Sequence, residues 1–197
     1  MSTNYSIGQM NQLGDALELA GFTADEVTKL RNFSQLKELR SLVNGHAQIT
    51  VAKHVIDMDA PSKRAPKEWE VREKDQLANR MRGQVEWNPT NASLFLSEKQ
   101  KADYDVGHDL RKDLEKLKPQ QLYTDAVVDF YLDHPEIPTP EVWLGKWIFC
   151  WGRVYRDASD DLIVRCLRCF RDGSRFSYCD YLGISFYSYS PALVAGK

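Results

Sequence analysis

The feature that most restricts the fold is a strand-rich run of aromatic and β-branched residues in the last third of the chain. The segments Trp143 to Arg156 and Leu162 to Phe170 favour strands, and the polar residues Asp157 to Asp161 form a turn between them. Arg171 to Ser174 contains Asp-Gly, which tolerates the positive φ of a hairpin turn, and leads into a third strand over Phe176 to Tyr181. The sequence therefore predicts an antiparallel sheet whose aromatic side chains supply most of its core.

The beginning of the chain has the spacing of short helices. A first helix ends before Gly21, because glycine tolerates the left-handed conformation found at helix ends, and Thr23 to Glu26 fits the capping box that begins a second helix. A third helix is expected from Ser34 to Val43, before Asn44-Gly45. The apolar positions of the first helix are Met10, Leu13, Leu17 and Ala20.

The middle of the chain mixes both patterns. A strand is expected within Ala47 to Ala60, residues 61–83 have the polar, proline-punctuated composition of a surface loop around Trp69, and Ser93 to Leu96 predicts a short strand. Two helices follow, with apolar positions Leu110, Leu114 and Leu117 in one and Leu122, Val127, Phe130 and Tyr131 in the other. We therefore expect an α+β fold with a helical region over 1–46, a mixed α/β scaffold over 47–140 and an antiparallel β region over 141–197.

No export signal or membrane segment is recognisable in the sequence. Met1 to Ile7 lacks a basic region followed by an apolar run, and no stretch approaches the roughly 18 to 20 apolar residues of a membrane helix. We expect a cytoplasmic protein without a membrane span, with export by an unrecognised route left open. The near-neutral balance of 26 Lys and Arg against 28 Asp and Glu disfavours nucleic-acid binding, which depends on clustered cations.

The sequence carries no recognisable catalytic or metal-binding motif. It lacks a phosphate-binding glycine loop, a supported Ser-His-Asp or Cys-His order and a His-x-x-x-His pair, so we expect neither enzyme activity nor a cofactor. Cys166 and Cys169 have a zinc-like spacing, but positions three apart in a strand face opposite sides, and a second such pair is missing. His54 likewise lies on the opposite strand face from Asp57 and Asp59, so no metal site is expected.

The segment from Ala158 to Ser190 has an unusual composition. It contains no Lys, Glu, Gln, Met or Trp, and apart from Lys197 all residues of these types lie in the first 157 positions. None of these five types has a codon ending in C, whereas every type present in the segment does. Repeated substitution at the first two bases of AAC codons would leave this pattern, although selection for a Tyr- and Ser-rich binding surface would mimic part of it.

Several motifs carry a resemblance to a known class of proteins. Leu162-Ile-Val-Arg-Cys-Leu167 and Phe186-Tyr-Ser-Tyr-Ser-Pro-Ala-Leu-Val-Ala195 look like the C-terminal part of variable proteins diversified by retroelements, known mostly from uncultivated bacterial lineages. Met10-Asn-Gln-Leu-Gly-Asp-Ala-Leu17 and Trp143-Leu-Gly-Lys-Trp-Ile-Phe-Cys-Trp-Gly152 are similar to hypothetical proteins from the same lineages. The likeness covers most of the chain.

The resemblance implies a target protein of a diversity-generating retroelement. In such systems a reverse transcriptase copies a template repeat and misreads its adenines, and the product replaces a variable repeat at the end of the target gene. The best-known targets display their variable residues on a C-type-lectin-like scaffold, but this chain lacks the Gly-Phe-Arg ending typical of that scaffold. The implied function is a ligand-binding display protein with a variable segment over 158–190.

On this hypothesis, strand alternation lets one face vary while the other keeps the core, with Val164, Leu167 and Leu182 as framework. The partner is an unknown protein or surface ligand, and the aromatic residues in Phe186 to Tyr189 form an exposed apolar patch. The expected contact residues are Arg168, Phe170, Arg171, Ser177, Cys179, Asp180, Tyr181, Ile184, Ser185, Tyr187, Tyr189 and Ser190.

Two other classes of function stay open. The N-terminal helices could dock a protein partner, support homo-oligomers or bind nucleic acid together with nearby arginines. Those arginines are Arg153, Arg156, Arg165 and Arg168. A small enzyme would instead need a convergent polar cleft, with His54 or His108 in it.

Overall fold

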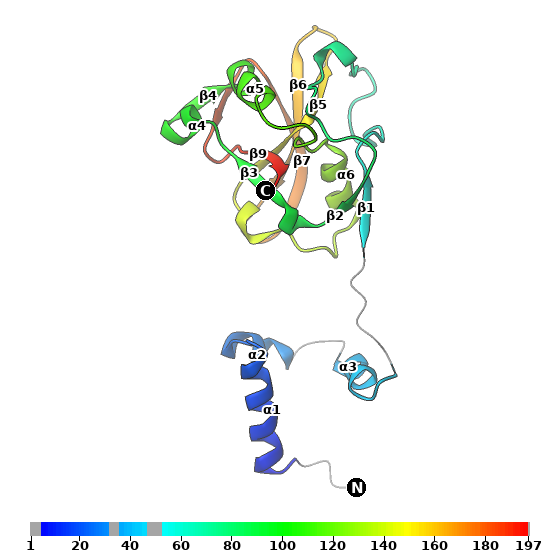
Figure 1. The fold of residues 1–197 in the computed structure, drawn as a ribbon, viewed down its shortest axis with the longest axis vertical. Coiled ribbons are helices and arrows are strands. Elements are labelled where there is room, and N and C mark those ends of the chain that lie inside the picture. Colours follow the sequence, from blue (N-terminus) through cyan, green and yellow to red (C-terminus); the bar gives the residue numbers. More distant parts are fainter. Residues whose placement is uncertain (1–4, 32–35, 47–52, 197) are drawn as a thin grey trace. The chain divides into compact units, whose positions relative to one another are not determined.

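The computed structural model describes residues 5–31, 36–46 and 53–196 and divides into two compact units, 1–52 and 53–197 (Figure 1). The order of elements confirms the predicted α+β class, with helices first and a sheet formed largely by the C-terminal strands. Ser34 and residues 47–52 of the region Ala47 to Ala60 lie outside the described residues, and the strand expected in that region is found at residues 54–57.

The N-terminal unit contains the three expected helices, α1 (Ile7–Leu19), α2 (Ala24–Leu30) and α3 (Leu36–Val43). The predicted capping box is confirmed, because the Thr23 hydroxyl accepts from the Glu26 amide while the Glu26 carboxylate accepts from the Thr23 amide. Gly21 has a φ of 84°, the left-handed conformation expected at a helix end. Neither α1 nor α2 buries a residue within this structure.

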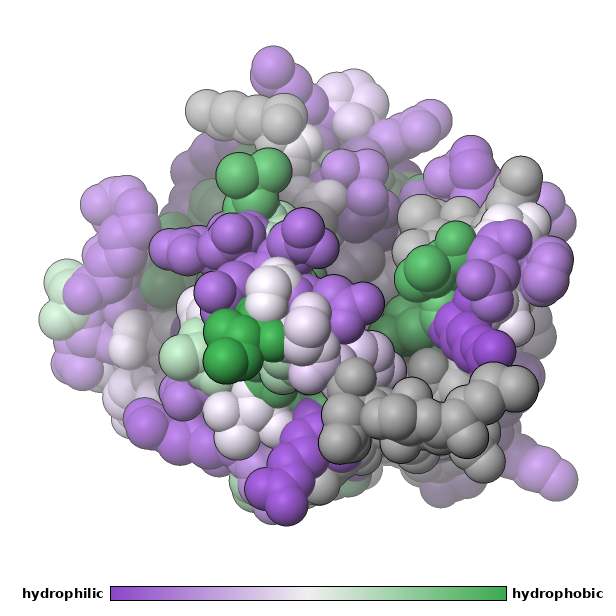
Figure 2. All heavy atoms as spheres, turned by 90° about the horizontal axis from the view of Figure 1, so that it is seen from below, coloured by the Kyte–Doolittle hydropathy of each residue, from purple (hydrophilic) through white to green (hydrophobic). Residues whose placement is uncertain are grey.

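Large apolar side chains are therefore exposed on the N-terminal unit. In the space-filling view of Figure 2, apolar side chains form separate green areas among hydrophilic ones. The exposed large apolar residues of this unit are Tyr5, Ile7, Met10, Leu13, Leu19, Phe22, Val27 and Val43.

The second unit is organised around a five-stranded sheet in the order β3-β9-β5-β6-β7 (Figure 1). The strands are β3 (Ala92–Phe95), β5 (Trp147–Arg156), β6 (Leu162–Cys169), β7 (Arg175–Tyr181) and β9 (Ala192–Ala195). The predicted antiparallel order of β5, β6 and β7 is confirmed, and only the short contact between β5 and β9 is parallel. Gly173, with a φ of 85°, occupies the predicted Asp-Gly turn between β6 and β7.

Smaller elements surround this sheet. β1 (His54–Asp57) pairs with β2 (Gln84–Trp87), and β4 (Tyr104–Val106) pairs with β8 (Ser185–Tyr187). The remaining helices and turns are η1 (Glu73–Asp75), η2 (Pro89–Asn91), α4 (Glu98–Ala102), α5 (Gly107–Glu115), α6 (Ala126–Asp133) and η3 (Glu141–Trp143).

Two apolar clusters cover the two faces of the sheet. On one face, Val127 and Tyr131 of α6 belong to a cluster with Ile148 and Leu167. On the other, Leu110 and Leu114 of α5 belong to a cluster with Trp151, Val164 and Phe186. Because each face has its own cover, residues 163–167 of β6 are all buried, and the expectation that one face of this strand is free to vary is wrong.

Two further expectations need correction. Leu122 was expected within a helix, but α6 begins at Ala126, and Leu122 forms bridges in extended conformation with Arg80 and Val194. The segment 61–83 is also more than a surface loop, because Leu77 and Met81 are buried. Both errors have the same cause. Leu77, Met81 and Leu122 are buried individually, and an isolated buried residue leaves no periodic pattern in the sequence.

Candidate functional site

The most distinctive surface of the second unit is a row of side chains that crosses the three-stranded end of the sheet. Trp147 of β5 lies opposite Arg168 of β6, and Arg168 lies opposite Phe176 of β7. The Arg168 guanidinium carbon is 4.6 Å from the centre of the Trp147 ring and 5.2 Å from that of Phe170, both within the range of cation–π attraction. One cation thus bridges aromatic rings on different segments.

More aromatic rings extend this row along β7. The ring centres of Trp147 and Tyr178 are 4.9 Å apart, and those of Phe170 and Phe176 are 5.6 Å apart. Phe170, Phe176 and Tyr178 nevertheless remain 37%, 41% and 46% exposed. We refer to Trp147, Arg168, Phe170, Phe176 and Tyr178 as the aromatic surface.

A group of tyrosines adjoins the aromatic surface. Tyr187 and Tyr189 are stacked with ring centres 5.5 Å apart, and Tyr104 of β4 lies 5.8 Å from Tyr187. The main-chain N–H of Trp147 donates to the carbonyl of Tyr189 at 2.8 Å, which joins this group to β5. All three tyrosines are exposed. Each of the two groups offers exposed rings suited to contact with a macromolecule.

The structure places the other expected contact residues in three environments. Arg171, Tyr181 and Ile184 are exposed. A second set, Ser177, Cys179, Asp180 and Ser185, is half-buried. Ser190 is only 6% exposed and its carbonyl accepts from Gln100, so its side chain is not available for contact.

Two half-buried residues of β7, Ser177 and Cys179, lie on the face of the sheet that α6 covers, opposite Leu167 and Arg165 of β6. Ser177 faces the α6 side of the sheet, where its hydroxyl accepts from Arg165 at 2.9 Å. Arg175 faces the same side and donates to the carbonyls of His134 and Ile137. Burial raises the pKa of both Cys179 and Asp180. The other face of β7 carries the exposed Phe176 and Tyr178 and the half-buried Asp180.

Sequence reasoning missed Phe176, Tyr178, Trp147 and Tyr104 as surface residues. The position of Phe176 and Tyr178 could have been inferred from the sequence. The turn at 170–174 fixes the register of the hairpin and places Arg168 opposite Phe176. Tyr104 lies far from the C-terminal segment in sequence, and only the β4–β8 pairing brings it to Tyr187. No local pattern indicates that contact.

On the face of the sheet that α6 covers, a buried carboxylate accepts hydrogen bonds from three side chains. Asp125 accepts from Arg153 at 2.9 Å, from Arg165 at 2.6 Å and from the Tyr155 hydroxyl at 2.7 Å, and its side chain has no exposed area. Arg165 also donates to Asp129 at 3.1 Å and to the Ser62 hydroxyl. Charged groups this deeply buried need such pairing.

A separate ion pair holds Arg156, which donates to both carboxylate oxygens of Asp75 at 2.6 and 2.9 Å. Arg153, Arg156 and Arg165 were candidates for binding nucleic acid. Because they are bound to internal carboxylates, these three side chains are occupied within the fold. Only Arg168 of the four proposed arginines belongs to the exposed aromatic surface.

The Asp75–Arg156 pair leads to a prediction about acid stability. The hydrogen bond from Arg156 lowers the pKa of Asp75, so its stabilising effect is full above the unfolded-state pKa of about 3.9 and is lost as pH falls through the lower folded pKa. We expect Asp75→Asn to lower the free energy of unfolding at pH 7, with the difference from wild type shrinking below about pH 4. Urea unfolding at pH 7, 4 and 3 measures this. A difference that is the same at pH 7 and pH 3 would contradict it.

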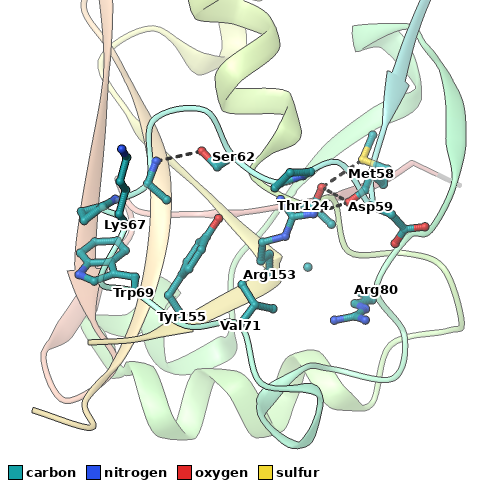
Figure 3. Close-up of a pocket in the computed structure, with 14 residues that line it drawn as sticks. Met58, Asp59, Ser62, Lys67, Trp69, Val71, Arg80, Thr124, Arg153 and Tyr155 are labelled. Atoms are coloured by element: carbon teal, nitrogen blue, oxygen red, sulfur yellow. Dashed lines mark hydrogen bonds between the residues drawn. The ribbon is translucent and has the colours of Figure 1, made fainter. Parts of the chain in front are cut away.

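A pocket of about 380 Å³ lies between the segment after β1 and the middle of β5 (Figure 3). In this view Tyr155 stands between Trp69 and Arg153. Three of its polar lining groups are bound to the scaffold: Thr124 donates to the Met58 carbonyl, as does Arg153, and Tyr155 donates to Asp125. These side chains therefore have a structural role, because their hydrogen bonds connect three segments of the chain.

His54, His108 and the two cysteines of the Cys-x-x-Cys spacing lie in different parts of the second unit. His54 packs against Phe130 and His134, with ring centres 5.3 and 5.8 Å away, while His108 is exposed at the start of α5. Cys166 belongs to the cluster on one face of the sheet and Cys169 to the cluster on the other, which confirms that their side chains diverge. Within residues 5–31, 36–46 and 53–196, no three His, Cys, Asp or Glu side chains are grouped to hold a metal ion.

Comparison with known protein families, with curated proteins and with solved structures finds no match to this chain. These comparisons therefore do not link the chain to the C-type-lectin-like scaffold of the best-known retroelement targets. Among the described helices, none is long and apolar enough to cross a membrane.

Proposed function

We propose that the protein is a ligand-binding display protein whose aromatic surface and adjoining tyrosines contact a protein or surface ligand. We further propose that retroelement-templated adenine mutagenesis diversifies the segment 158–190. One observation carries the proposal. Segment 158–190, which lacks Lys, Glu, Gln, Met and Trp, supplies most of the exposed aromatic rings, including Phe170, Phe176, Tyr178, Tyr187 and Tyr189.

The chemistry of the surface supports binding. Phenylalanine and tyrosine rings offer a large contact area and lose little conformational entropy when they are immobilised. Arg168 adds a charge beside these rings, and arginine is enriched with tyrosine at the energetic centres of interfaces. Buried residues of the same segment, such as Val164 and Leu182, belong to the core and give the rings a rigid support.

The genomic neighbourhood of the gene provides the direct test of diversification. We expect a reverse-transcriptase gene nearby and a near-copy of the DNA encoding residues 158–190 that differs from it only at adenines of the copy. These differences should fall at codons of exposed residues such as Tyr178 and Tyr187. A neighbourhood with neither gene nor near-copy would overturn the diversification hypothesis.

The segment should also tolerate change at its exposed positions and not at its buried ones. We expect Tyr187→Ala to change the free energy of unfolding by less than about 1 kcal/mol, because Tyr187 is 38% exposed. Leu182→Ala, at a position with no exposed area, is expected to cost about 2 to 5 kcal/mol. Chemical denaturation of both variants measures the contrast. Equal losses would show that the surface is part of the structural core.

A further inference from the structure

β7 forms one edge of the five-stranded sheet, with β6 as its only neighbour among the described strands. At one end of this pairing the Phe170 N–H donates to the Ser174 carbonyl, and at the other the Leu182 N–H donates to the Leu162 carbonyl. Hydrogen-bonded pairs alternate along an antiparallel ladder, so the main-chain groups of Phe176, Tyr178 and Asp180 point to β6. Those of Ser177 and Cys179 consequently point away from the sheet.

These outward groups have no partner within the described chain. No hydrogen bond outside the ladder involves the main-chain N–H or C=O of Ser177 or Cys179. Together they offer two donors and two acceptors at the spacing that an added strand requires.

The edge lacks several features that usually prevent strand pairing, although β7 carries the charged residues Arg175 and Asp180. Such features include lysine, proline, bulges and short length. β7 has seven residues, contains neither lysine nor proline, and pairs with β6 in an unbroken register from Arg175 to Tyr181. The opposite edge strand, β3, has only four residues. β7 is thus the better template for a further strand.

We propose that the free edge of β7 binds an extended peptide segment of a partner protein, which adds a sixth strand to the sheet. This inference rests on the proposed function, because it specifies the class of ligand that the display surface takes. Side chains of the added strand alternate between the two faces of the sheet, and those on the outer face lie beside Phe176 and Tyr178.

An extended peptide fits a diversified strand better than a fixed protein surface does. The outward main-chain groups are the same whatever side chains occupy β7, so they supply a contact that is kept in every variant. The side chains at Phe176 and Tyr178 then determine which peptides bind best. A second copy of the chain would instead need the varying side chains to remain complementary to themselves.

The test uses dodecamer peptides selected from a random displayed library against the full chain. Ser177→Pro removes one outward N–H and obstructs the edge with its ring, whereas the matched control Ser177→Ala keeps the N–H and loses only the hydroxyl contact with Arg165. We expect the selected peptides to bind wild type and Ser177→Ala alike and to lose at least about ten-fold in affinity for Ser177→Pro. Cys179→Pro and Cys179→Ala form a second matched pair.

Peptides methylated on alternate main-chain nitrogens provide a test that leaves the protein unchanged. Methylation of the residues that face β7 should abolish binding, and methylation of the intervening residues should not. The proposal is overturned if no peptide is enriched, if the proline variants and methylated peptides bind normally, or if wild type forms a dimer that Ser177→Pro abolishes. The genomic test is independent, so peptide binding without a reverse-transcriptase gene would refute diversification and leave the edge site standing.

Discussion

Asp125→Asn is expected to lower the free energy of unfolding by about 3 to 5 kcal/mol, because it removes the charge that compensates two buried arginines. Arg153 and Arg165 both donate to this carboxylate, and the side chains of both arginines are at least nine-tenths buried. An amide has one acceptor oxygen in place of two, so at least one arginine or the Tyr155 hydroxyl loses its partner. A loss of this size is a large fraction of the 5 to 15 kcal/mol that is typical of whole domains.

Asp113→Asn serves as the matched control, since it makes the same chemical change in a carboxylate at the surface. Asp113 pairs with Lys116, whose side chain is 74% exposed, and such pairs contribute about 0 to 1 kcal/mol. Urea unfolding of both variants at pH 7 measures the difference. Similar small losses for the two would mean that the Asp125 network does not stabilise the fold.

Gly152→Ala is expected to cost about 3 kcal/mol by forcing two main-chain segments apart. A Cβ at this position would lie 2.5 Å from the Leu122 carbonyl oxygen and 2.7 Å from the carbonyl group of Tyr123. Neither can move freely, because the Leu122 carbonyl accepts from Met81 and the Tyr123 carbonyl accepts from Gly152 itself. Glycine is therefore required for the close approach of β5 to this segment.

Gly183→Ala is the control for this substitution, because a Cβ there would meet no atom within 4 Å. We expect it to change the free energy of unfolding by less than about 1 kcal/mol. Thermal unfolding of the two variants measures the contrast. If Gly152→Ala unfolds at the same temperature as Gly183→Ala, the packing of β5 against residues 122–123 is looser than the structure indicates.

The parts of the fold that could be predicted from the sequence are those with local signals. The Asp-Gly turn and the strand pattern on either side of it predicted β6 and β7, and the capping box predicted the start of α2. The apolar spacing of Leu110 and Leu114 gave α5. In each case the information lies within about one turn or one hairpin, where backbone preferences act directly.

The remainder depends on contacts between distant residues. The sequence does not show that Asp125 meets Arg165, because 40 positions separate them. It does not show either that α6 and α5 cover both faces of β6, which is why the expected alternation failed there. The same limit applies to the candidate site. Phe170, Tyr187 and Tyr189 were predicted as contact residues, but Phe176 and Tyr178 were not, because the direction of their side chains depends on the register of the sheet.

The position of β9 has a consequence for how the protein is made. This strand lies between β3 and β5 although it is the last element of the sheet in sequence, so the ribosome must translate through Ala195 before the sheet can be completed. Until then β3 and β5 lack the strand that joins them, and their apolar residues stay accessible to chaperones and proteases. A stop codon or frameshift anywhere in 158–190 would remove β9 as well. A product that stops before β9 therefore cannot form the complete five-stranded sheet.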